Sequence, residues 1–293
     1  MATELTEEGE FHRASSIEEA VTLLEERNAA LISGGQSLMP LIRQGLIDRD
    51  VIVDISGIDD HTDIAVTDDG LQLGGLATHR DLIEADLWET PYRALPETAK
   101  EIGDKQVRNW GTIGGSVAHA DPSLDYPPTM IVLDAGVQYT DGTETKEVPI
   151  DEFYLGQYFT VLEPHEIVIG VRVPKPSANT GVAFEKFAWR RGDMSLVNVA
   201  ASVTVDETGS EIEAARIAVG AMGPTPLRLT ELEAELVGSD PSDESHQQAV
   251  ADRVGEFTEP VPEAHGSVEY KNRIATNLTR KTIRTAIERA TEN

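Results

Sequence analysis

The sequence contains no cysteine, and this absence excludes several kinds of chemistry. Disulfide bonds, thiolate zinc sites, a thiol nucleophile and iron–sulfur clusters held by this chain would all require cysteine. Long apolar runs are missing as well, because the run at residues 130–133 ends at Asp134, whereas a membrane helix needs about 20 predominantly apolar residues. Residues 1–11 are acidic and lack the basic and apolar regions of a signal peptide. We therefore expect a cytoplasmic protein without a membrane span.

Basic residues are also scarce: 24 Lys and Arg, only seven of them Lys, stand against 52 Asp and Glu, for a net charge of −28. Nucleic acids and anionic membranes are bound through clustered positive charge, so neither is an expected partner. A surface this acidic repels itself unless salt screens it, which predicts a halophilic protein in a salt-rich cytoplasm. An ordinary acidic protein is the alternative.

The length of 293 residues, 40% of them apolar, predicts two packed units. The stretch at residues 174–180, which contains two prolines, is the expected boundary. Before it, the apolar spacing predicts helices at 17–26 and 92–103, strands at 29–32, 51–55, 71–76 and 166–173, and a β-rich stretch at 129–139. After it, the pattern predicts a three-stranded meander at 181–189, 197–205 and 214–220, and helices at 228–236, 242–256 and 267–292.

A first glycine pair follows an apolar run, in the sequence Leu31-Ile32-Ser33-Gly34-Gly35-Gln36-Ser37-Leu38. Adjacent glycines allow positive φ and let backbone N–H groups approach an anion closely. The hydroxyl groups of Ser33 and Ser37 add uncharged donors. Pyrophosphate is the natural ligand of such a loop, and a purely structural turn is the alternative.

A second glycine pair repeats this pattern in the sequence Thr112-Ile113-Gly114-Gly115-Ser116. Each pair lies between two hydroxyl residues, which suggests two walls around one polyphosphate. We expect the amides of Gly34, Gly35, Gly114 and Gly115 to be the donors.

Charged residues downstream add further candidates. Asp121 and Asp125 could accept from ribose hydroxyls, and Asp121 could instead cap a turn. His119 could be a proton donor, a metal ligand or a structural residue, but the other six histidines show no metal-binding spacing.

Lys186 lies between aromatic residues in a strand-like stretch, where its charge would stabilise a reduced, anionic ring. A surface lysine with a partly buried stem is the alternative for Lys186.

Several common sites are absent from the sequence. No Gly-Lys-Ser/Thr follows either glycine pair, which excludes a Walker loop, and no Gly-x-Gly-x-x-Gly fingerprint occurs. There is no Ser-His-Asp order with a nucleophile elbow and no glycosidase-like pair of carboxylates. The residues thus predict binding of a dinucleotide-like anion through backbone amides, and they identify no substrate.

Three segments together resemble a known family. They are residues 29–41 with the Ser-Gly-Gly-Gln-Ser core, residues 102–116 with the string Gln-Val-Arg-Asn-Trp-Gly-Thr-Ile-Gly-Gly, and residues 121–127. They are similar to the FAD-binding medium subunit of molybdenum hydroxylases, the family of aerobic carbon monoxide dehydrogenase and xanthine dehydrogenase. The string is highly specific, and the resemblance runs nearly end to end.

The resemblance implies an α+β fold. Residues 1–176 would form an FAD-binding domain of the p-cresol methylhydroxylase (vanillyl-alcohol-oxidase-like) type, with two subdomains that divide near residue 57. Residues 177–293 would form a C-terminal α+β domain of the carbon monoxide dehydrogenase flavoprotein type, with a three-stranded antiparallel sheet and helices.

The resemblance also implies the cofactor-binding residues. The diphosphate would lie between the two glycine pairs, Asp125 would contact a ribityl or ribose hydroxyl, and Lys186 would lie near the isoalloxazine. Met194 occupies a position where some relatives have an aromatic residue over the flavin. The full set is Leu31, Ile32, Ser33, Gly34, Gly35, Gln36, Ser37, Leu38, Thr78 and His79 near the adenine, Ile102 lining the flavin, Thr112, Ile113, Gly114, Gly115, Ser116, Asp125, Val168 at the ring edge, and Lys186.

The function implied by the resemblance is that of an oxidoreductase subunit. It would pass electrons from the iron–sulfur clusters of a small [2Fe-2S] partner, through FAD, to NAD⁺, a quinone or oxygen. A large molybdopterin partner would hydroxylate the substrate, in a complex expected to be a dimer of heterotrimers. This chain would hold no metal and no residue catalytic toward that substrate. A scaffold subunit without flavin is the alternative.

Overall fold

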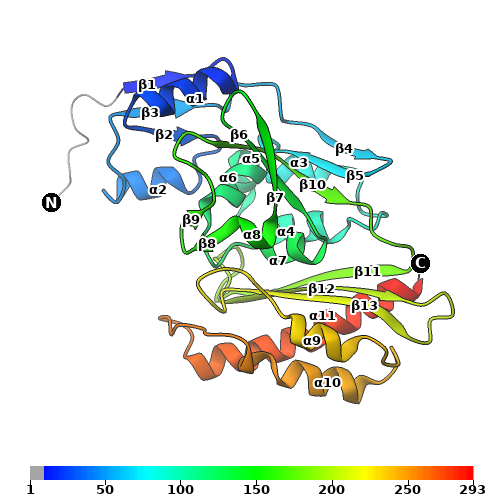
Figure 1. The fold of residues 1–293 in the computed structure, drawn as a ribbon. Helices are drawn as coiled ribbons and strands as arrows, with labels where there is room; N and C mark the ends of the chain where they lie inside the picture. Colours follow the sequence, from blue (N-terminus) through cyan, green and yellow to red (C-terminus); the bar gives the residue numbers. More distant parts are fainter. Residues whose placement is uncertain (1–9, 293) are drawn as a thin grey trace.

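The computed structural model describes residues 10–292, and a small parallel sheet lies at the N-terminal end of this range (Figure 1). Its strands follow the order β1 (Glu10–Arg13), β3 (Val51–Asp54), β2 (Ala29–Ile32), and α1 (Ile17–Glu26) connects β1 to β2. The predicted helix is confirmed, and the side chain of Ser16 caps it by accepting from the N–H of Glu19. After β2 comes α2 (Leu38–Arg43). The acidic stretch at residues 1–11 was expected not to be a signal peptide. Residues 1–9 of this stretch lie outside the described residues.

A five-stranded antiparallel sheet forms the second layer. Its order is β4 (Ile64–Thr67), β5 (Gly70–Gly74), β10 (Ile167–Pro174), β6 (Gly136–Thr140), β7 (Thr145–Pro149). The helices of this layer are α3 (His79–Glu84), α4 (Ala94–Glu101), α5 (Lys105–Trp110), α6 (Ile113–His119), α7 (Tyr126–Val132) and α8 (Ile150–Phe153). A short hairpin, β8 (Tyr154–Gly156) and β9 (Phe159–Thr160), follows α8.

The β-rich prediction for residues 129–139 is wrong over its first part, because α7 occupies residues 126–132 and the strand β6 starts only at Gly136. Pro127 and Pro128 lie in the first turn of α7, where proline is tolerated because the N–H groups of that turn have no helical partner. Every residue of α7 is buried, so the helix has no polar face that would give it helical periodicity.

The C-terminal unit contains an antiparallel sheet in the order β11 (Thr180–Phe187), β12 (Val197–Val205), β13 (Ile212–Gly220), β14 (Leu227–Arg228). The predicted meander is confirmed, and the two-residue β14 adds a fourth strand to the three expected. Three helices and a short 3₁₀ turn follow: α9 (Thr230–Leu236), α10 (Glu244–Asp252), η1 (Val254–Glu256) and α11 (Val268–Glu292).

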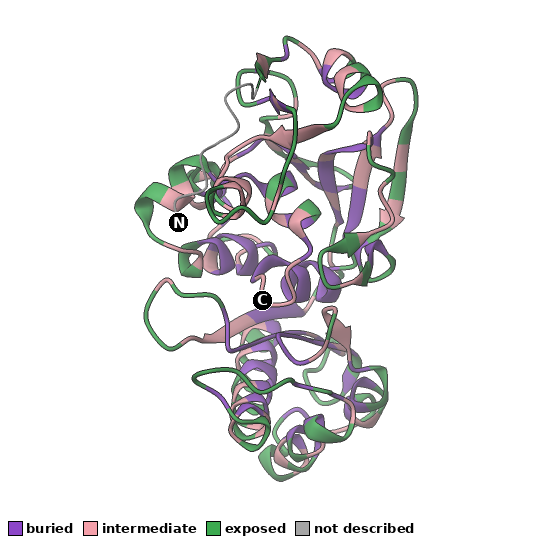
Figure 2. Ribbon diagram, turned by 90° about the vertical axis from the view of Figure 1, so that its left-hand side faces the viewer, coloured by how far each residue is buried: buried purple, intermediate pink, exposed green. Residues whose placement is uncertain are grey.

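The C-terminal sheet lies between two layers of helices (Figure 1). One face packs on α9, α10 and α11, and the other places Val182, Ala200 and Ala218 in the same core as α7. Buried residues are accordingly concentrated where the middle helices meet this sheet (Figure 2). Within residues 10–292, no helix has the length and apolar character needed to span a membrane.

Candidate functional site

The first glycine pair forms the turn between β2 and α2. Gly35 has a φ of +67°, in the left-handed region that favours glycine. A Cβ on Gly34 would overlap the carbonyl oxygen of Trp110, so only glycine allows this close approach. Within residues 10–292, none of the backbone N–H groups of residues 34–37 has a hydrogen-bond acceptor. The turn therefore presents consecutive unpaired donors at a half-buried position.

The second glycine pair lies in the first turn of α6. Thr112 caps this helix, and its Oγ1 accepts from the N–H of Gly115 at 3.1 Å. The N–H of Gly114 donates to the carbonyl oxygen of Gly75 at 2.8 Å. Both amides already have acceptors inside the protein, which disfavours the predicted role of these two amides as donors to the pyrophosphate. The capping threonine starts a helix here, and the helix packs its glycines against the preceding strand connection.

The structure brings the two glycine pairs together. The hydroxyl oxygens of Ser33 and Thr112 lie 2.9 Å apart. A Cβ on Gly115 would lie 2.8 Å from both of these oxygens. Ser33 and Thr112 are 79 residues apart in the sequence, yet they are in direct contact next to the unpaired amides of the first turn.

Thr78 and His79 lie beside the second pair. Thr78 forms an isolated β-bridge with Thr112, and it caps α3 in a reciprocal capping box with Asp81. The backbone N–H of His79 donates to the carbonyl oxygen of Gly111 at 3.0 Å. Both predicted residues therefore adjoin the site, and they fix the backbone that leads into α6.

Asp125 and Lys186 form a buried ion pair between the two units. Lys186 Nζ lies 2.6 Å from Asp125 Oδ2, with side chains 4% and 6% exposed. Asp125 Oδ1 accepts from Ser195 Oγ at 2.5 Å and from Asn198 Nδ2 at 3.2 Å. Burial raises the pKa of Asp125, and these three donors oppose the shift. Both carboxylate oxygens of Asp125 are thus engaged by the protein, whereas the family resemblance implies a contact with a ribityl or ribose hydroxyl.

Lys186 also connects to the segment predicted to line the ring. Its Nζ donates to the carbonyl oxygen of Glu101 at 3.0 Å, directly before Ile102. An ammonium group has three donors, and within the described residues the third has no acceptor. Val168 lies on β10. Its carbonyl oxygen is close to Gly75, and a Cβ on Gly75 would lie 2.7 Å from this oxygen. Val168 therefore lies behind the second glycine pair.

Asp121 and His119, two further candidates from the sequence, make contacts within the protein that fit their alternative structural roles. Asp121 Oδ1 accepts from the N–H of Ser123 at 2.8 Å, as a turn cap does, and Oδ2 accepts from the hydroxyl of Tyr158 at 2.9 Å. The His119 ring packs against Tyr158, with ring centroids 5.4 Å apart. Met194 is 53% exposed.

Sequence reasoning missed four residues that organise the site: Gly111, Tyr126, Ser195 and Asn198. Asn198 is a polar residue within an otherwise apolar stretch of strand, which was an available signal. The tyrosine precedes two prolines and carries no such signal.

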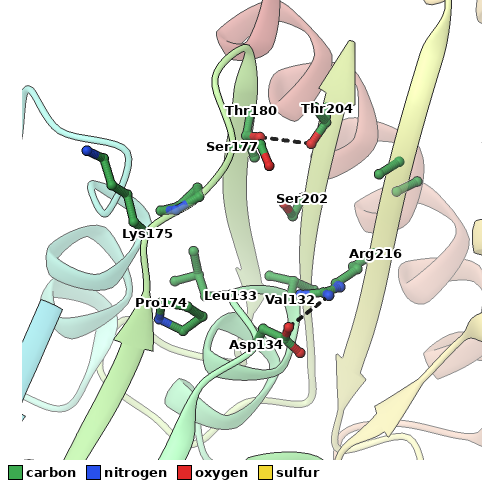
Figure 3. Close-up of a pocket in the computed structure, with 13 residues that line it drawn as sticks. Val132, Leu133, Asp134, Pro174, Lys175, Ser177, Thr180, Ser202, Thr204 and Arg216 are labelled. Carbon is green, nitrogen blue, oxygen red and sulfur yellow. Dashed lines mark hydrogen bonds and ion pairs between the residues drawn. The ribbon is translucent and has the colours of Figure 1, made fainter. Parts of the chain in front are cut away.

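A separate cavity of about 240 Å³ lies between α7 and the C-terminal sheet (Figure 3). At its wall Arg216 pairs with Asp134 at 3.0 Å, and the hydroxyls of Thr180 and Thr204 lie 2.8 Å apart. Thr180 begins β11, so Lys186 lies about 20 Å away along the same strand. None of the predicted cofactor residues lines this cavity.

The geometry can be compared with known proteins. Residues 6–176 match the model of the FAD binding domain in molybdopterin dehydrogenase, and residues 182–286 match that of the CO dehydrogenase flavoprotein C-terminal domain. The chain is 32% identical to the carbon monoxide dehydrogenase medium chain of Hydrogenophaga pseudoflava, over 94% of this chain and 96% of that one. It is 33% identical to the 6-hydroxypseudooxynicotine dehydrogenase complex subunit alpha of Paenarthrobacter nicotinovorans, over 94% of each.

Solved structures agree with these matches. A carbon monoxide dehydrogenase structure from Hydrogenophaga pseudoflava matches with a TM-score of 0.91 and 33% identity, over 96% of this chain and 98% of that one. Quinoline 2-oxidoreductase from Pseudomonas putida 86 matches with a TM-score of 0.88 and 30% identity, with the same coverage. The fold is therefore that of the carbon monoxide dehydrogenase medium chain, with mixed α and β content. The resemblance inferred from the sequence is confirmed, and the chain belongs to the FAD-binding medium subunits of the molybdenum hydroxylases.

Proposed function

We propose that residues 34–37 bind the diphosphate of FAD through their backbone N–H groups. The observation that carries this proposal is the row of N–H groups without acceptors in the first glycine turn. A diphosphate supplies the acceptor oxygens that these groups lack, and consecutive N–H dipoles favour an anion. The segment with the second glycine pair supports the first turn through the contact between Thr112 and Ser33. The amides of its two glycines already have acceptors within the protein.

The isoalloxazine would lie on the side of Lys186, Ile102 and Val168. The third N–H of Lys186 is available to the ring, and its positive charge would stabilise the reduced, anionic form. Asp125 would act through Lys186, because its oxygens hold the ammonium group and accept from two further donors. Thr78 and His79 would lie toward the adenosine. When bound, FAD supplies the redox chemistry, while the protein sets its orientation and potential.

The finer fold description remains part of this proposal. Residues 1–176 would be an FAD domain of the p-cresol methylhydroxylase type, and residues 177–293 the C-terminal domain. The change from the parallel sheet of β1–β3 to the antiparallel sheet that starts with β4 supports a division of the first domain near residue 57. The separate cores of these layers support the same division.

The proposed partners are a small [2Fe-2S] subunit and a large molybdopterin subunit, in a cytoplasmic dimer of heterotrimers. Electrons would enter from the small partner and leave to NAD⁺, a quinone or oxygen. The similarity to medium chains of multisubunit dehydrogenases supports this assembly. The substrate pocket would lie on the large partner, so residues of that partner, and not of this chain, would select the substrate.

A flavin absorbance spectrum of the purified full chain tests the function. We expect the visible bands of bound flavin at a flavin-to-protein ratio near one, and release of FAD on denaturation. A folded chain that stayed colourless after incubation with excess FAD would contradict the proposal and favour the scaffold role.

The strongly acidic composition supports the proposal of a protein adapted to high salt. We expect the free energy of unfolding to rise when KCl increases from millimolar to molar concentration, because salt screens the repulsion between carboxylates. A stability that did not increase with salt would favour an ordinary acidic protein.

A further inference from the structure

A histidine and a tyrosine behind the second glycine pair form an isolated polar contact in the core. The hydroxyl oxygen of Tyr126 lies 3.0 Å from Nδ1 of His79, and the rings meet edge to face with centroids 5.3 Å apart. Tyr126 is fully buried and His79 is 4% exposed. The two residues are the first residues of α7 and α3, so their contact joins the starts of these two helices.

This contact decides which nitrogen of His79 carries the proton. Within the described residues, the Tyr126 hydroxyl has no other hydrogen-bond partner. If it accepted from Nδ1–H, the proton of the fully buried hydroxyl would have no acceptor, which is costly, whereas an Nε2–H remains within reach of water or a ligand. The hydroxyl therefore donates, Nδ1 accepts, and a neutral ring keeps its proton on Nε2. Burial also lowers the pKa of His79 to about 4, with the charge of Arg108 adding to the shift, so the ring is neutral near pH 7.

The Nε2 atom lies where the two glycine-pair segments meet. A Cβ on Gly111 would be 2.7 Å from His79 Nε2, and a Cβ on Gly34 would be 2.8 Å from the Cα of Gly111. Nε2 thus packs against Gly111, and Gly111 in turn packs against Gly34 of the first glycine turn. Within residues 10–292 Nε2 has no hydrogen-bond partner, and it is not one of the fully buried unpaired polar atoms, so it is a donor that water or a ligand can reach.

We propose that Tyr126 is a positioning residue that fixes the Nε2–H tautomer of His79, and that this N–H donates to an oxygen of the FAD diphosphate. The inference rests on the function proposed above and adds one donor to the backbone N–H groups of residues 34–37. It also places a side-chain donor from α3 beside the second segment, independent of the amides of that segment's glycines.

The tautomer can be measured without the cofactor. A long-range ¹H–¹⁵N spectrum of the full chain near pH 7 records both ring nitrogens of each histidine, and the His79→Gln spectrum assigns the signals. We expect a protonated Nε2 and an unprotonated Nδ1 in the wild type, and a mixture of tautomers in Tyr126→Phe. A wild-type ring with its proton on Nδ1 would overturn the inference whether or not FAD binds.

Two substitutions of His79 separate donation from packing. His79→Asn can keep an acceptor near the Nδ1 position for Tyr126 but has no atom at Nε2, whereas His79→Gln places an amide N–H close to Nε2. We expect His79→Asn to weaken FAD binding by about ten- to a hundredfold, the range for a hydrogen bond to a charged group, and His79→Gln to stay within about threefold of the wild type. His165→Asn, at a half-exposed surface histidine, serves as the matched control and should bind as the wild type does.

The outcomes are distinguishable when thermal unfolding confirms that each variant is folded. An unchanged FAD affinity in His79→Asn, or equal losses in the Asn and Gln variants, would overturn donation from Nε2. A wild-type chain that bound no FAD would contradict the proposed function instead, and the tautomer measurement would still test the role of Tyr126.

Discussion

The two glycine pairs have similar sequences, but their backbones are used differently. In the first pair, the turn between β2 and α2 leaves the N–H groups of residues 34–37 without acceptors. In the second, α6 begins at once, and the N–H groups of Gly114 and Gly115 donate to Gly75 and to the capping Thr112. A Gly-Gly motif can therefore bind an anion through its backbone only where the local structure leaves its amides unpaired. One pair is thus a candidate binding surface, and the other is a packing element that supports it.

The largest effect on cofactor binding should follow Gly34→Ala. The added Cβ overlaps the carbonyl oxygen of Trp110, which is backbone and cannot rotate away, so the first turn must move. Loss of several charge-assisted hydrogen bonds should lower FAD affinity by at least roughly a hundredfold, measured as the flavin-to-protein ratio and by titration. Gly57→Ala is the matched control, because its Cβ would meet only ordinary contacts at 3.5 Å. Stoichiometric flavin in Gly34→Ala would refute the role given to the first pair.

Gly114→Ala tests the contrasting role of the second pair. Its Cβ would lie 2.8 Å from the carbonyl oxygen of Gly75, so α6 must shift against the strand connection it packs on. We expect the free energy of unfolding to fall by about 1–3 kcal/mol, the usual cost of overpacking, in chemical denaturation. The loss of stability should exceed the loss of FAD affinity of the folded fraction. The reverse order would mean that the second pair also binds the diphosphate.

The pH dependence of stability should report on His79, which lies behind the second pair. The pKa is about 4 in the folded protein and near 6.5 in the unfolded chain, so the unfolded state binds more protons between these values. Stability from this group is complete above pH 6.5 and is lost as the pH falls toward 4. Denaturation at pH 7 and pH 5 should show the wild type losing about 2 kcal/mol more than His79→Gln. Equal losses would show that the ring is not held neutral.

The smallest effect is expected at the contact that joins the two pairs. Ser33→Ala removes the hydrogen bond to Thr112 and leaves the cap of Gly115 in place. One such bond contributes about 1 kcal/mol, so thermal unfolding should show a small decrease and FAD affinity a change of only a few-fold. Thr112→Val should cost more, because it removes the cap as well. If both substitutions had equal effects, the capping bond would contribute nothing.

Local patterns predicted much of the fold. The spacing and N-cap of α1 were sufficient, because this helix buries one face and exposes the other. The C-terminal meander was recognised from apolar, β-rich runs separated by turn residues, although β12 is covered on both faces. The helix α7 was missed because it is buried on all sides, and β14 because two residues are too short for a pattern.

The sequence predicted which residues lie together at the candidate site better than it predicted their hydrogen-bond partners. Family resemblance and motif spacing brought together residues that the structure also places together. Hydrogen bonding could not be derived in this way, because the partner of the Gly114 amide is Gly75, and Asn198 and Ser195 reach Asp125 only through the folded strand order. Whether an amide or a carboxylate is free for a ligand depends on such long-range contacts.

In the proposed binding mode, the diphosphate of FAD contacts the first glycine turn and not the amides of the second glycine pair. A crystal structure of the full chain with FAD tests it most directly. We expect diphosphate oxygens within about 3 Å of the backbone nitrogens of residues 34–37, with the Gly114 N–H still bonded to Gly75. A diphosphate bound by the amides of Gly114 and Gly115, with the first turn free of it, would contradict the account.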